Sequence, residues 1–335
     1  MAYATGDGGR NLCNSSAKPG RIIDRVANLS AIRHSDRRLT VGVDVGGTWV
    51  RLAASQGGRR IATLVARADR DLGALPRALG AIWRRQGWRR RDVAALVVAS
   101  RAIWTARERR ALARALSGLA RRVHVLSDAQ AALLGALGDE PGVLVLSGTG
   151  SIVVGHDGRG RWARAGGLGP LVGDEGSGFW LGREWLRARV QRGELLAALR
   201  AVHAPDAVTR IAALAPRMLA RARRGDPRAR AIARAGQARL AAHARAVARA
   251  LRLSGPVDVS WAGSVMEDPW FRAGAVKALG RSGFRARWRR PAAEPVAAAL
   301  RVAERMSEEV RAATLPRAGP RERRGERYGV PYGPR

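Results

Sequence analysis

The chain of 335 residues has few of the features that would place it in a membrane or in an oxidising compartment. It contains no apolar run near the roughly 18 residues that a membrane-spanning helix needs, and its polar start lacks the apolar core of a secretory signal. Its single cysteine, Cys13, excludes an intramolecular disulfide, a zinc knuckle and an iron–sulfur cluster held by this chain alone. We therefore expect a cytoplasmic protein without membrane contact.

Lysine is also scarce, because Lys18 and Lys277 are the only two, so arginine supplies nearly all of the basic charge behind the formal net charge of +34. Clustered basic groups bind nucleic acid by displacing counterions from its phosphates. Here the arginines are instead spread with alanine along almost every expected helix, and few of the ten tryptophans interleave with them as base stacking would require. Nucleic acid is not the expected partner, although strong, salt-sensitive binding to it would reverse that interpretation.

The two ends of the chain differ in composition from its body. Residues 1–38 show no sustained periodicity, and residues 315–335 combine proline, glycine and arginine with almost no aliphatic side chains. We expect a flexible N-terminal extension and a disordered C-terminal tail. The hydrophobic share of 46% is ample for a sizeable core between them.

Within that body the same order of elements occurs twice. The first half begins with the strand-like LTVGVDVG, a glycine turn and two further strands, WVRLAAS and IATLVAR, before helices and strands alternate. The second half starts over with GVLVLSGTGSIVVGHDGRGRWARAGG, which again reads as three strands, and long helices and the strand VDVSWAG follow. This repetition predicts an α/β protein with an N-terminal lobe at 39–137 and a C-terminal lobe at 138–314, whose last helix could return to the first lobe. Two such lobes would enclose a cleft.

Each half contains a glycine turn directly after its first strand, VDVGGT at 43–48 and LSGTGS at 146–151. Either turn alone could be an ordinary hairpin. A pair at equivalent positions favours a nucleotide triphosphate held from both sides, because bare backbone N–H groups suit phosphoryl oxygens. The residues that would bind the phosphates are Gly46, Gly47, Thr48, Gly148, Thr149 and Gly150. Asp44, at the end of the first strand, could hold hydrated Mg²⁺ through its carboxylate.

Asp128 follows a short strand and opens an apolar helix in LSDAQAAL. It could be no more than the N-cap of that helix, since an Asp before a helix accepts from free backbone N–H groups. An acid at a strand end that faces a cleft could instead accept a proton from an attacking hydroxyl. Both interpretations are open at this point.

The stretch AGGLGPLVGDEGSGFWLGREWLR at 165–187 packs seven glycines around Asp174 and Glu175. Glycines allow backbone to approach a ligand closely, and a carboxylate accepts hydrogen bonds from sugar hydroxyls. In the alternative interpretation, Asp174, Glu175 and Ser177 only cap the helix that carries the following aromatic residues into the core.

Taken in order with WAGSVMEDPWF, these motifs resemble the N-acetylglucosamine kinase and BadF/BadG/BcrA/BcrD-type ATPase family, within the superfamily of actin, sugar kinases and heat-shock chaperones. The resemblance covers about residues 40–305. It implies two RNase H-like lobes around an ATP cleft, ATP and Mg²⁺ as cofactors, and Asp128 as the catalytic base. It also implies an adenosine turn at residues 262–264, with the nucleotide positions Gly263, Ser264 and Glu267. The implied sugar positions are Asp128, Gly167, Leu168, Gly169 and Asp174.

Three departures from the family pattern concern the acceptor. Leu168 stands where an aromatic residue is typical, residues 66–75 lack the usual asparagine, and the segment around Ser100 lacks the usual glycines. We expect an ATP-dependent kinase that phosphorylates an amino sugar, N-acetylglucosamine or a related one. An ATPase that drives a partner protein without an iron–sulfur cluster is the alternative, and a sugar or nucleotide sensor without turnover is a further one. A homodimer is also left open.

Overall fold

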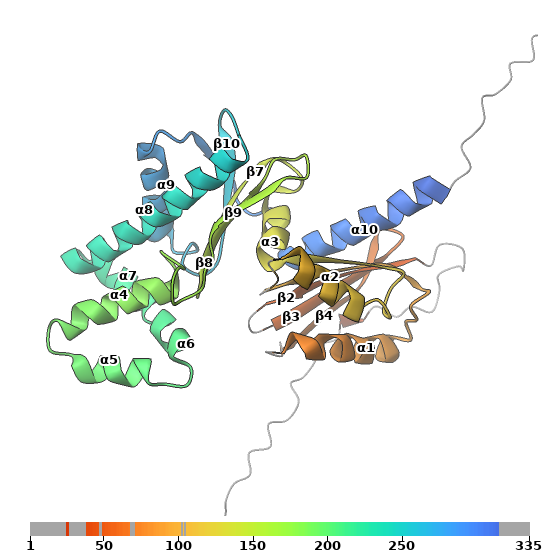
Figure 1. Cartoon of the computed structure of the whole chain (residues 1–335), viewed down its shortest axis with the longest axis horizontal. Coiled ribbons are helices and arrows are strands. Elements are labelled where there is room, and N and C mark those ends of the chain that lie inside the picture. Colours follow the sequence, from red (N-terminus) through yellow and green to blue (C-terminus); the bar gives the residue numbers. More distant parts are fainter. Residues whose placement is uncertain are drawn as a thin grey trace, which may run out of the picture.

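The computed structural model describes residues 25–26, 38–46, 49–67, 71–101, 103 and 105–314. The predictions for Gly47 and Thr48, for the C-terminal tail and for most of the N-terminal extension lie outside these residues. The elements separate into two lobes that lie side by side along the long axis (Figure 1).

The first lobe is built on a six-stranded sheet in the order β1-β4-β3-β2-β5-β6. Its strands are β1 (Arg25–Val26), β2 (Leu39–Val45), β3 (Trp49–Gln56), β4 (Arg59–Arg67), β5 (Val93–Ser100) and β6 (Arg122–Ser127). The helical elements of this part of the chain are η1 (Leu72–Ala74), α1 (Leu75–Gln86), α2 (Ala106–Ala115) and α3 (Asp128–Leu137). β2, β3 and β4 form an antiparallel meander, while β5 and β6 run parallel to β2.

The second lobe repeats this plan in a five-stranded sheet, β11-β10-β7-β8-β9. Its strands are β7 (Gly142–Ser147), β8 (Ser151–His156), β9 (Trp162–Gly166), β10 (Val257–Ala262) and β11 (Ala286–Trp288). The remaining helices are α4 (Gly178–Val190), α5 (Leu195–Val202), α6 (Ala207–Ala212), α7 (Ala215–Arg223), α8 (Pro227–Ala250), α9 (Pro269–Arg281) and α10 (Pro295–Thr314). The order β4-β3-β2-β5-β6 matches β9-β8-β7-β10-β11, which confirms the predicted α/β fold of two similar lobes.

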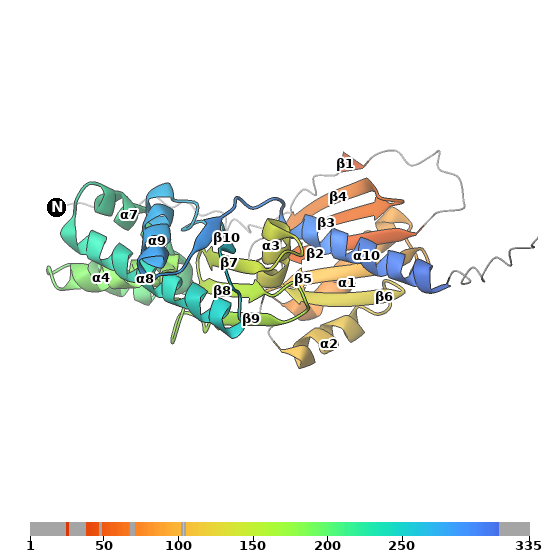
Figure 2. The same ribbon diagram turned by 90° about the horizontal axis from the view of Figure 1, so that it is seen from above.

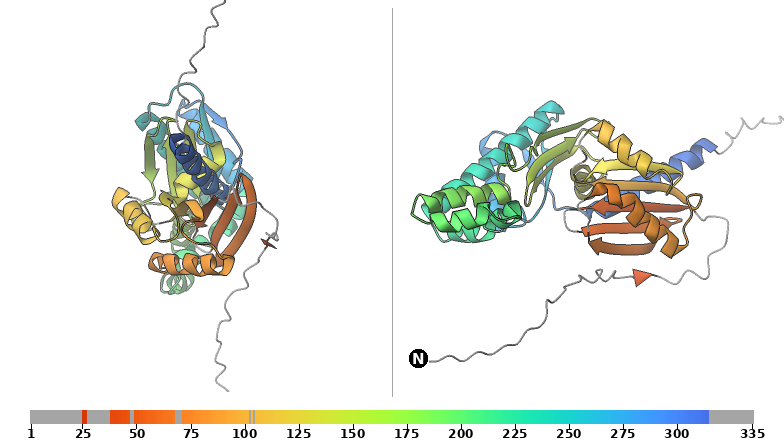
Figure 3. Two further views of the ribbon diagram at one scale, coloured as in Figure 1. Left: turned by 90° about the vertical axis from the view of Figure 1, so that its right-hand side faces the viewer. Right: turned by 60° about the horizontal axis from the view of Figure 1, so that its bottom comes forward.

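The alternating side chains of β5 show why the first sheet needs helices on both faces. Leu96 and Val98 belong to the apolar cluster that includes residues of α1, whereas Val97 and Ala99 belong to the cluster with α3 and α10. Successive side chains of a strand point to opposite faces, so a fully apolar parallel strand must be covered twice. Helices α4 to α9 gather in the second lobe, as the right-hand view of Figure 3 shows.

Helix α3 lies between the two sheets (Figure 2). Ala131 and Leu134 pack with the first sheet, while Ala129 and Leu133 pack with Leu144 and other residues of the second. A helix that is apolar around its circumference is typical of an element buried on all sides. The first residue of this helix, Asp128, therefore sits where the two lobes meet.

Helix α10 returns from the second lobe to cover β2 and β5 of the first. It can approach β2 closely because residue 42 is glycine: a Cβ there would lie 2.7 Å from Leu300 Cα and closer still to Leu300 N.

The structure differs from the sequence-based expectations in two places. β1 adds two residues of the expected N-terminal extension to the edge of the first sheet, and α5 to α7 at residues 195–223 are short helices in a half of the chain where long ones were expected. Helices α5 to α7 are short, and α5 exposes the apolar Leu195 and Leu196. The hydrophobic periodicity of this segment therefore gave little guidance to its helices. None of the helices in the described ranges could cross a bilayer.

We expect Gly42→Ala to lower the free energy of unfolding by about 1–3 kcal/mol, the usual cost of inserting atoms into a well-packed contact. Urea denaturation of the purified protein would measure the change. The matched control is Gly280→Ala on α9, where an added Cβ meets no atom within 4 Å and improves helix propensity. Equal stability of Gly42→Ala and wild type would contradict the close packing of α10 on β2.

Candidate functional site

Three charged residues lie at the carboxyl ends of neighbouring parallel strands in the first lobe. In the register of the sheet Val45 pairs with Ser100, and Ser100 pairs with Ser127. Asp44 therefore lies at the end of β2 and Asp128 directly after β6, with Arg101 after the central strand β5. Ligands of open α/β sheets bind at this edge, because the helix N-termini and loops that follow the strands converge there.

The environment of Asp44 favours a bound cation. Only 5% of this residue is exposed, and Arg51 Nη1 lies 3.5 Å from its Oδ2. Burial raises the pKa of Asp44 to about 6; the Arg51 charge opposes this rise and the nearby charge of Asp128 adds to it. The effect of Asp128 indicates that the two carboxylates are within electrostatic reach of each other.

The acids at this edge fit the requirements of Mg²⁺. The described residues include no group of three or more His, Cys, Asp and Glu side chains that could enclose a metal ion. Mg²⁺ does not need such a cage, since it is usually held by one or two carboxylates, by phosphate oxygens and by retained waters. Asp44, a buried carboxylate repelled by a second one, suits that role.

Asp128 is not the N-cap of α3, so that alternative is wrong. Ser127 is the cap: its side chain accepts from Gln130 N at 3.1 Å, and the Gln130 side chain accepts from Ser127 N. Asp128 Oδ1 accepts from Ala129 N at 2.7 Å. Burial raises the pKa of Asp128, while the hydrogen bond from Ala129 and the charge of Arg101 lower it. A carboxylate that is not the cap and whose pKa is raised by burial is suited to proton transfer.

The first glycine turn is described only in part. Gly46 N donates to Trp49 O at 2.9 Å and so closes the hairpin between β2 and β3. The N–H of Gly46 is therefore used within the hairpin, and Gly47 and Thr48 fall outside the described residues. Phosphate binding by this turn stays a prediction.

The second glycine turn, residues 147–151, is hydrogen-bonded to the start of α4 and to the residues just before it. Gly178 N donates to Gly148 O at 2.7 Å, and Phe179 N donates to Thr149 O at 3.1 Å. Two serine hydroxyls of the turn also bond to the backbone before α4: Ser147 Oγ donates to Gly176 O at 2.8 Å, and Ser151 Oγ donates to Glu175 O at 2.9 Å. The turn is thus fixed before any ligand arrives.

The N–H groups of this turn have unequal roles. Gly148 N donates to Gly150 O at 2.9 Å inside the turn, which leaves Thr149 and Gly150 as the residues able to offer N–H groups to a phosphate. Gly148 instead brings the turn close to the segment 262–264: a Cβ on it would lie 3.7 Å from both Gly263 Cα and Ser264 N.

Residues 262–264 pack directly on this turn. Gly263 has a φ of 91°, and a Cβ there would lie 2.8 Å from Gly148 N, so only glycine fits. Val265 N donates to Ser147 O at 3.0 Å and fixes the contact.

A cavity of about 320 Å³ opens between these two segments and helices α6 and α7. Its lining includes Gly148, Thr149, Thr209, Pro216, Ser264 and Asp268. This volume suits a small aromatic group such as a nucleobase. Glu267, the other expected nucleotide contact, is exposed and is not among the described residues that line the cavity.

Asp174 lies against the second glycine turn. A Cβ on Gly150 would be 2.7 Å from Asp174 Oδ2, so the glycine makes room for this carboxylate. Asp174 is buried, and its φ of 58° is left-handed, which is rare for a residue other than glycine. Burial raises its pKa, and backbone N–H groups of Ser151 and Gly169 lower it. Strained backbone of this kind is concentrated at functional sites.

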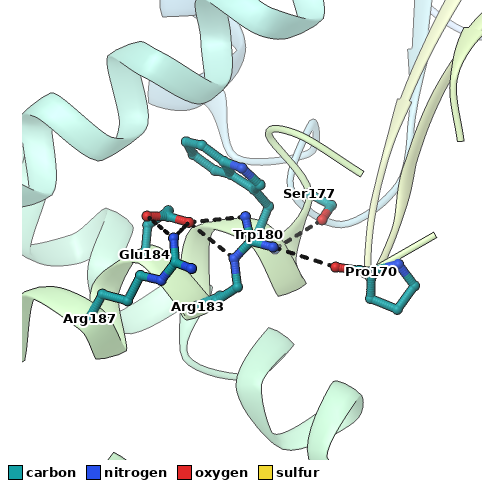
Figure 4. Close-up of polar contacts among 6 residues, drawn as sticks. All are labelled: Pro170, Ser177, Trp180, Arg183, Glu184 and Arg187. Atoms are coloured by element: carbon teal, nitrogen blue, oxygen red, sulfur yellow. Dashed lines mark hydrogen bonds and ion pairs between the residues drawn. The ribbon is translucent and has the colours of Figure 1, made fainter. Parts of the chain in front are cut away.

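Of the three residues in the capping interpretation, only Ser177 caps α4, where its side chain accepts from Trp180 N at 3.1 Å; Asp174 and Glu175 do not. The same helix anchors the loop before it (Figure 4): Arg183 Nη1 donates to Pro170 O at 3.5 Å. Glu184 holds Arg183 in place through an ion pair of 3.0 Å.

The loop between β9 and α4 combines a glycine base with an exposed apolar tip. A Cβ on Gly167, whose φ is 68°, would meet the side chain of Ile152, which packs in one cluster with Ala129 beside Asp128. Gly169 O accepts from Gly173 N at 2.9 Å and closes the loop. The tip residues Leu168, Leu171 and Val172 are exposed at 63%, 91% and 75%. Exposed apolar side chains beside a polar site are candidates for ligand contact.

Sequence reasoning missed Arg101, Leu171, Val172 and Thr209. The apolar LGPLV within a glycine-rich loop was the available signal for Leu171 and Val172. No sequence pattern pointed to Thr209, because it lines the cavity from the short helix α6, about 60 residues beyond the second glycine turn.

These features define a two-lobed protein of the actin-like fold, with a cavity of nucleotide-base size next to a fixed glycine turn. Residues 41–287 match the BadF/BadG/BcrA/BcrD ATPase family, and the chain belongs to it. This confirms the family resemblance found in the sequence.

Three individual proteins are similar to the chain. An N-acetylmuramic acid/N-acetylglucosamine kinase from Clostridium acetobutylicum is 43% identical over 77 residues, which are 22% of this chain and 25% of that protein. The match thus spans about a quarter of the curated relative's length. The structure of a candidate N-acetylglucosamine kinase from Chromobacterium violaceum is 25% identical, with a TM-score of 0.57 over 79% of this chain and 99% of that one. A candidate N-acetylglucosamine kinase from Porphyromonas gingivalis, 19% identical, shares the fold with a TM-score of 0.61 over 81% and 99% of the two chains.

The raised pKa of Asp44 predicts a pH-dependent cost in stability. Because its folded pKa of about 6 exceeds the ordinary 3.8, the folded state binds the extra proton in this window, and stability falls as the pH rises through it. In the absence of metal, we expect the Asp44→Asn variant to have a free energy of unfolding roughly 2–3 kcal/mol above that of wild type at pH 8. The figure follows from about 1.4 kcal/mol for each unit of pKa shift. The gain should shrink towards pH 4.

Denaturant titrations at pH 4.5, 6 and 8 would measure this difference, with the surface variant Asp92→Asn as the control. A stability gain that is the same at all three pH values would show that burial does not disfavour the charged form of Asp44.

Proposed function

We propose that the chain is an ATP-dependent kinase that transfers the γ-phosphoryl group to a hydroxyl of an amino sugar, N-acetylglucosamine or a related one. The observation that carries the proposal is the packing of the Asp174 loop, the second glycine turn and the cavity against one another. This contiguity supports a nucleotide and an acceptor meeting at one place. The amino-sugar kinases among its relatives support the choice of acceptor.

In this proposal the nucleobase occupies the cavity lined by Thr209, Pro216 and Ser264, and the phosphates extend towards the N–H groups of Thr149 and Gly150. The hairpin at Gly46 approaches them from the first lobe. Asp44 holds Mg²⁺, which when bound supplies positive charge to the phosphate oxygens. Backbone donors fixed in advance stabilise the charge that develops during transfer without having to reorganise.

Asp128 acts as the general base. As the acceptor oxygen forms its bond to the γ-phosphorus, the hydroxyl proton passes to the Asp128 carboxylate, and the bond from the γ-phosphorus to the β–γ bridging oxygen breaks to release ADP. The raised pKa of this carboxyl brings it closer to the range in which a base works near neutral pH. Asp174 and the loop at Gly167–Gly169 hold the other hydroxyls of the sugar.

Helix α3 couples closure of the two lobes to the position of Asp128. Because α3 packs on both sheets, a rotation of one lobe against the other repositions its first residue, Asp128. Closure of this kind excludes water and limits wasteful hydrolysis of ATP. The alternative of an ATPase that drives a partner protein remains compatible with the family; turnover of ATP that no sugar changes and that a partner protein stimulates would favour it.

We expect Asp128→Asn to lower sugar-dependent release of ADP by 10²-fold or more, because a positioned general base contributes about that much. A coupled assay with a panel of amino sugars measures turnover, and a thermal shift with MgADP checks that the nucleotide still binds. The control is Glu308→Gln, a change of exposed charge on α10. Turnover by Asp128→Asn at the wild-type rate would remove Asp128 as the base.

We expect Ala213→Phe to block the nucleobase, since Ala213 is exposed and lines the cavity, so a larger side chain fills it without disturbing the core. The stabilisation by MgADP should fall, because binding to the folded state raises the melting temperature in proportion to ln(1 + [L]/Kd). The matched control is Ala235→Phe, on the exposed face of α8. An undiminished shift in Ala213→Phe would place the nucleotide elsewhere.

A further inference from the structure

A second cavity, of about 340 Å³, lies in the first lobe at the edge of the sheet opposite the candidate site. Half of its lining is arginine, and these residues define the arginine cavity: Arg90, Arg110, Arg114 and Arg121. The cavity adjoins the amino ends of the parallel strands β5 and β6, whose carboxyl ends lead to Ser100 and Asp128. β5 has eight residues and therefore spans about 26 Å. The arginine cavity is thus separate from the site proposed for ATP and the sugar.

The described residues around this cavity carry charge of one sign. None of its described lining residues is acidic. Arg110 and Arg114 lie one turn apart on α2, and like charges at this spacing destabilise a helix. The acids nearby in sequence are engaged elsewhere: Glu108 Oε2 accepts from Thr105 N at 2.7 Å, and Asp92 Oδ2 accepts from a backbone N–H at 2.9 Å. Positive charge is therefore concentrated here without a carboxylate in the described lining to offset it.

Two of the arginines are fixed at the cavity by backbone carbonyls. Arg90 Nε donates to Ser117 O at 3.1 Å. Arg121 Nε donates to Arg91 O at 2.9 Å. Each bond uses one of the five N–H groups of a guanidinium and leaves others for a ligand. Because these two side chains are already ordered, binding costs less conformational entropy than it would with free arginines.

The chemistry of the ligand follows from this charge and from the remaining walls. A phosphate monoester carries about −1.5 to −2 charge at pH 7 and offers three acceptor oxygens, which guanidinium groups bind in bidentate pairs. A carboxylate would bring only a single charge to the four arginines. Ala113, Ala120 and Val123 form an apolar part of the lining, and the volume falls in the range of small-molecule sites. The cavity therefore has room for an organic body beside the phosphate.

Nucleic acid fits the cavity less well than a small phosphorylated molecule does. Proteins that bind single strands without sequence preference combine a basic groove with aromatic side chains on which the bases stack. The described residues that line the arginine cavity include no aromatic side chain.

We propose that the arginine cavity binds the phosphate group of a phosphorylated small molecule. Arg90 and Arg121 orient the phosphate, Arg110 and Arg114 supply further charge, and the apolar walls contact the organic body. This site goes beyond the proposed kinase function and does not depend on it.

The test uses the full chain with the double substitution Arg110→Gln/Arg114→Gln and phenyl phosphate as the probe. Both side chains are exposed, so urea denaturation should find the variant as stable as wild type. We expect calorimetric titration to show that wild type binds the probe and that the variant binds it about 10-fold or more weakly, because two charge-assisted contacts are lost. The matched control, Arg77→Gln/Arg84→Gln on α1, removes the same charge from exposed positions outside the described lining and should bind like wild type.

Benzoate has the ring of phenyl phosphate but only one charge, so we expect wild type to bind it about 10-fold or more weakly. Benzoate binding as tight as that of phenyl phosphate would reject phosphate as the recognised group. Equal affinity of wild type and Arg110→Gln/Arg114→Gln for phenyl phosphate would place the ligand elsewhere, and equal losses in both double variants would show an effect of net charge alone.

A short single-stranded RNA tests the competing class of ligand. RNA binding that depends on Arg110 and Arg114, together with no binding of phenyl phosphate, would assign the cavity to nucleic acid and overturn the proposal. Because these titrations need no turnover, the phosphate site holds or fails independently of the kinase assignment.

Discussion

The candidate site depends on the close backbone packing between the turn at residues 147–151 and the start of α4. Four hydrogen bonds join them, two between backbone groups and two from serine hydroxyls to carbonyls. Two glycines make room for further neighbours of this turn: a Cβ at Gly150 would collide with Asp174, and one at Gly263 would collide with the backbone of residues 147 and 148. The loop that holds Asp174, the turn at residues 147–151 and the adjoining cavity thereby become one rigid surface of the second lobe, and a rigid donor array is what electrostatic catalysis needs.

The first lobe contributes charge to that surface. Asp44, Arg101 and Asp128 lie at the ends of three adjacent parallel strands, so their spacing is set by the sheet and not by loops. Helix α3 belongs to the packing of both lobes and begins with one of these acids. The chemistry of each lobe is thus incomplete alone, and the helix between them transmits their relative position to the proposed base.

Much of this could be predicted from the sequence, because the signals were local. Glycine turns after β-branched strands located both hairpins, and the repeated order of elements gave the two-lobed fold. Helices α5 to α7 were missed, since they are short and α5 leaves leucines exposed. Capping could be assigned only in part: Asp128 was one candidate cap of α3 but Ser127 is the cap, and of the three candidates at α4 only Ser177 is the cap, as the backbone geometry shows.

By itself the sequence determined the family, the order of the elements along the chain and the residue types that could bind phosphate and accept a proton. Only the tertiary structure placed Asp174 against Gly150, assembled the cavity from segments far apart in the chain, and set Arg101 between two acids with its Nε buried. The reason is physical. Turns and strands follow from neighbouring residues, whereas the environment of a charge depends on which strands pair and how deeply their ends are buried.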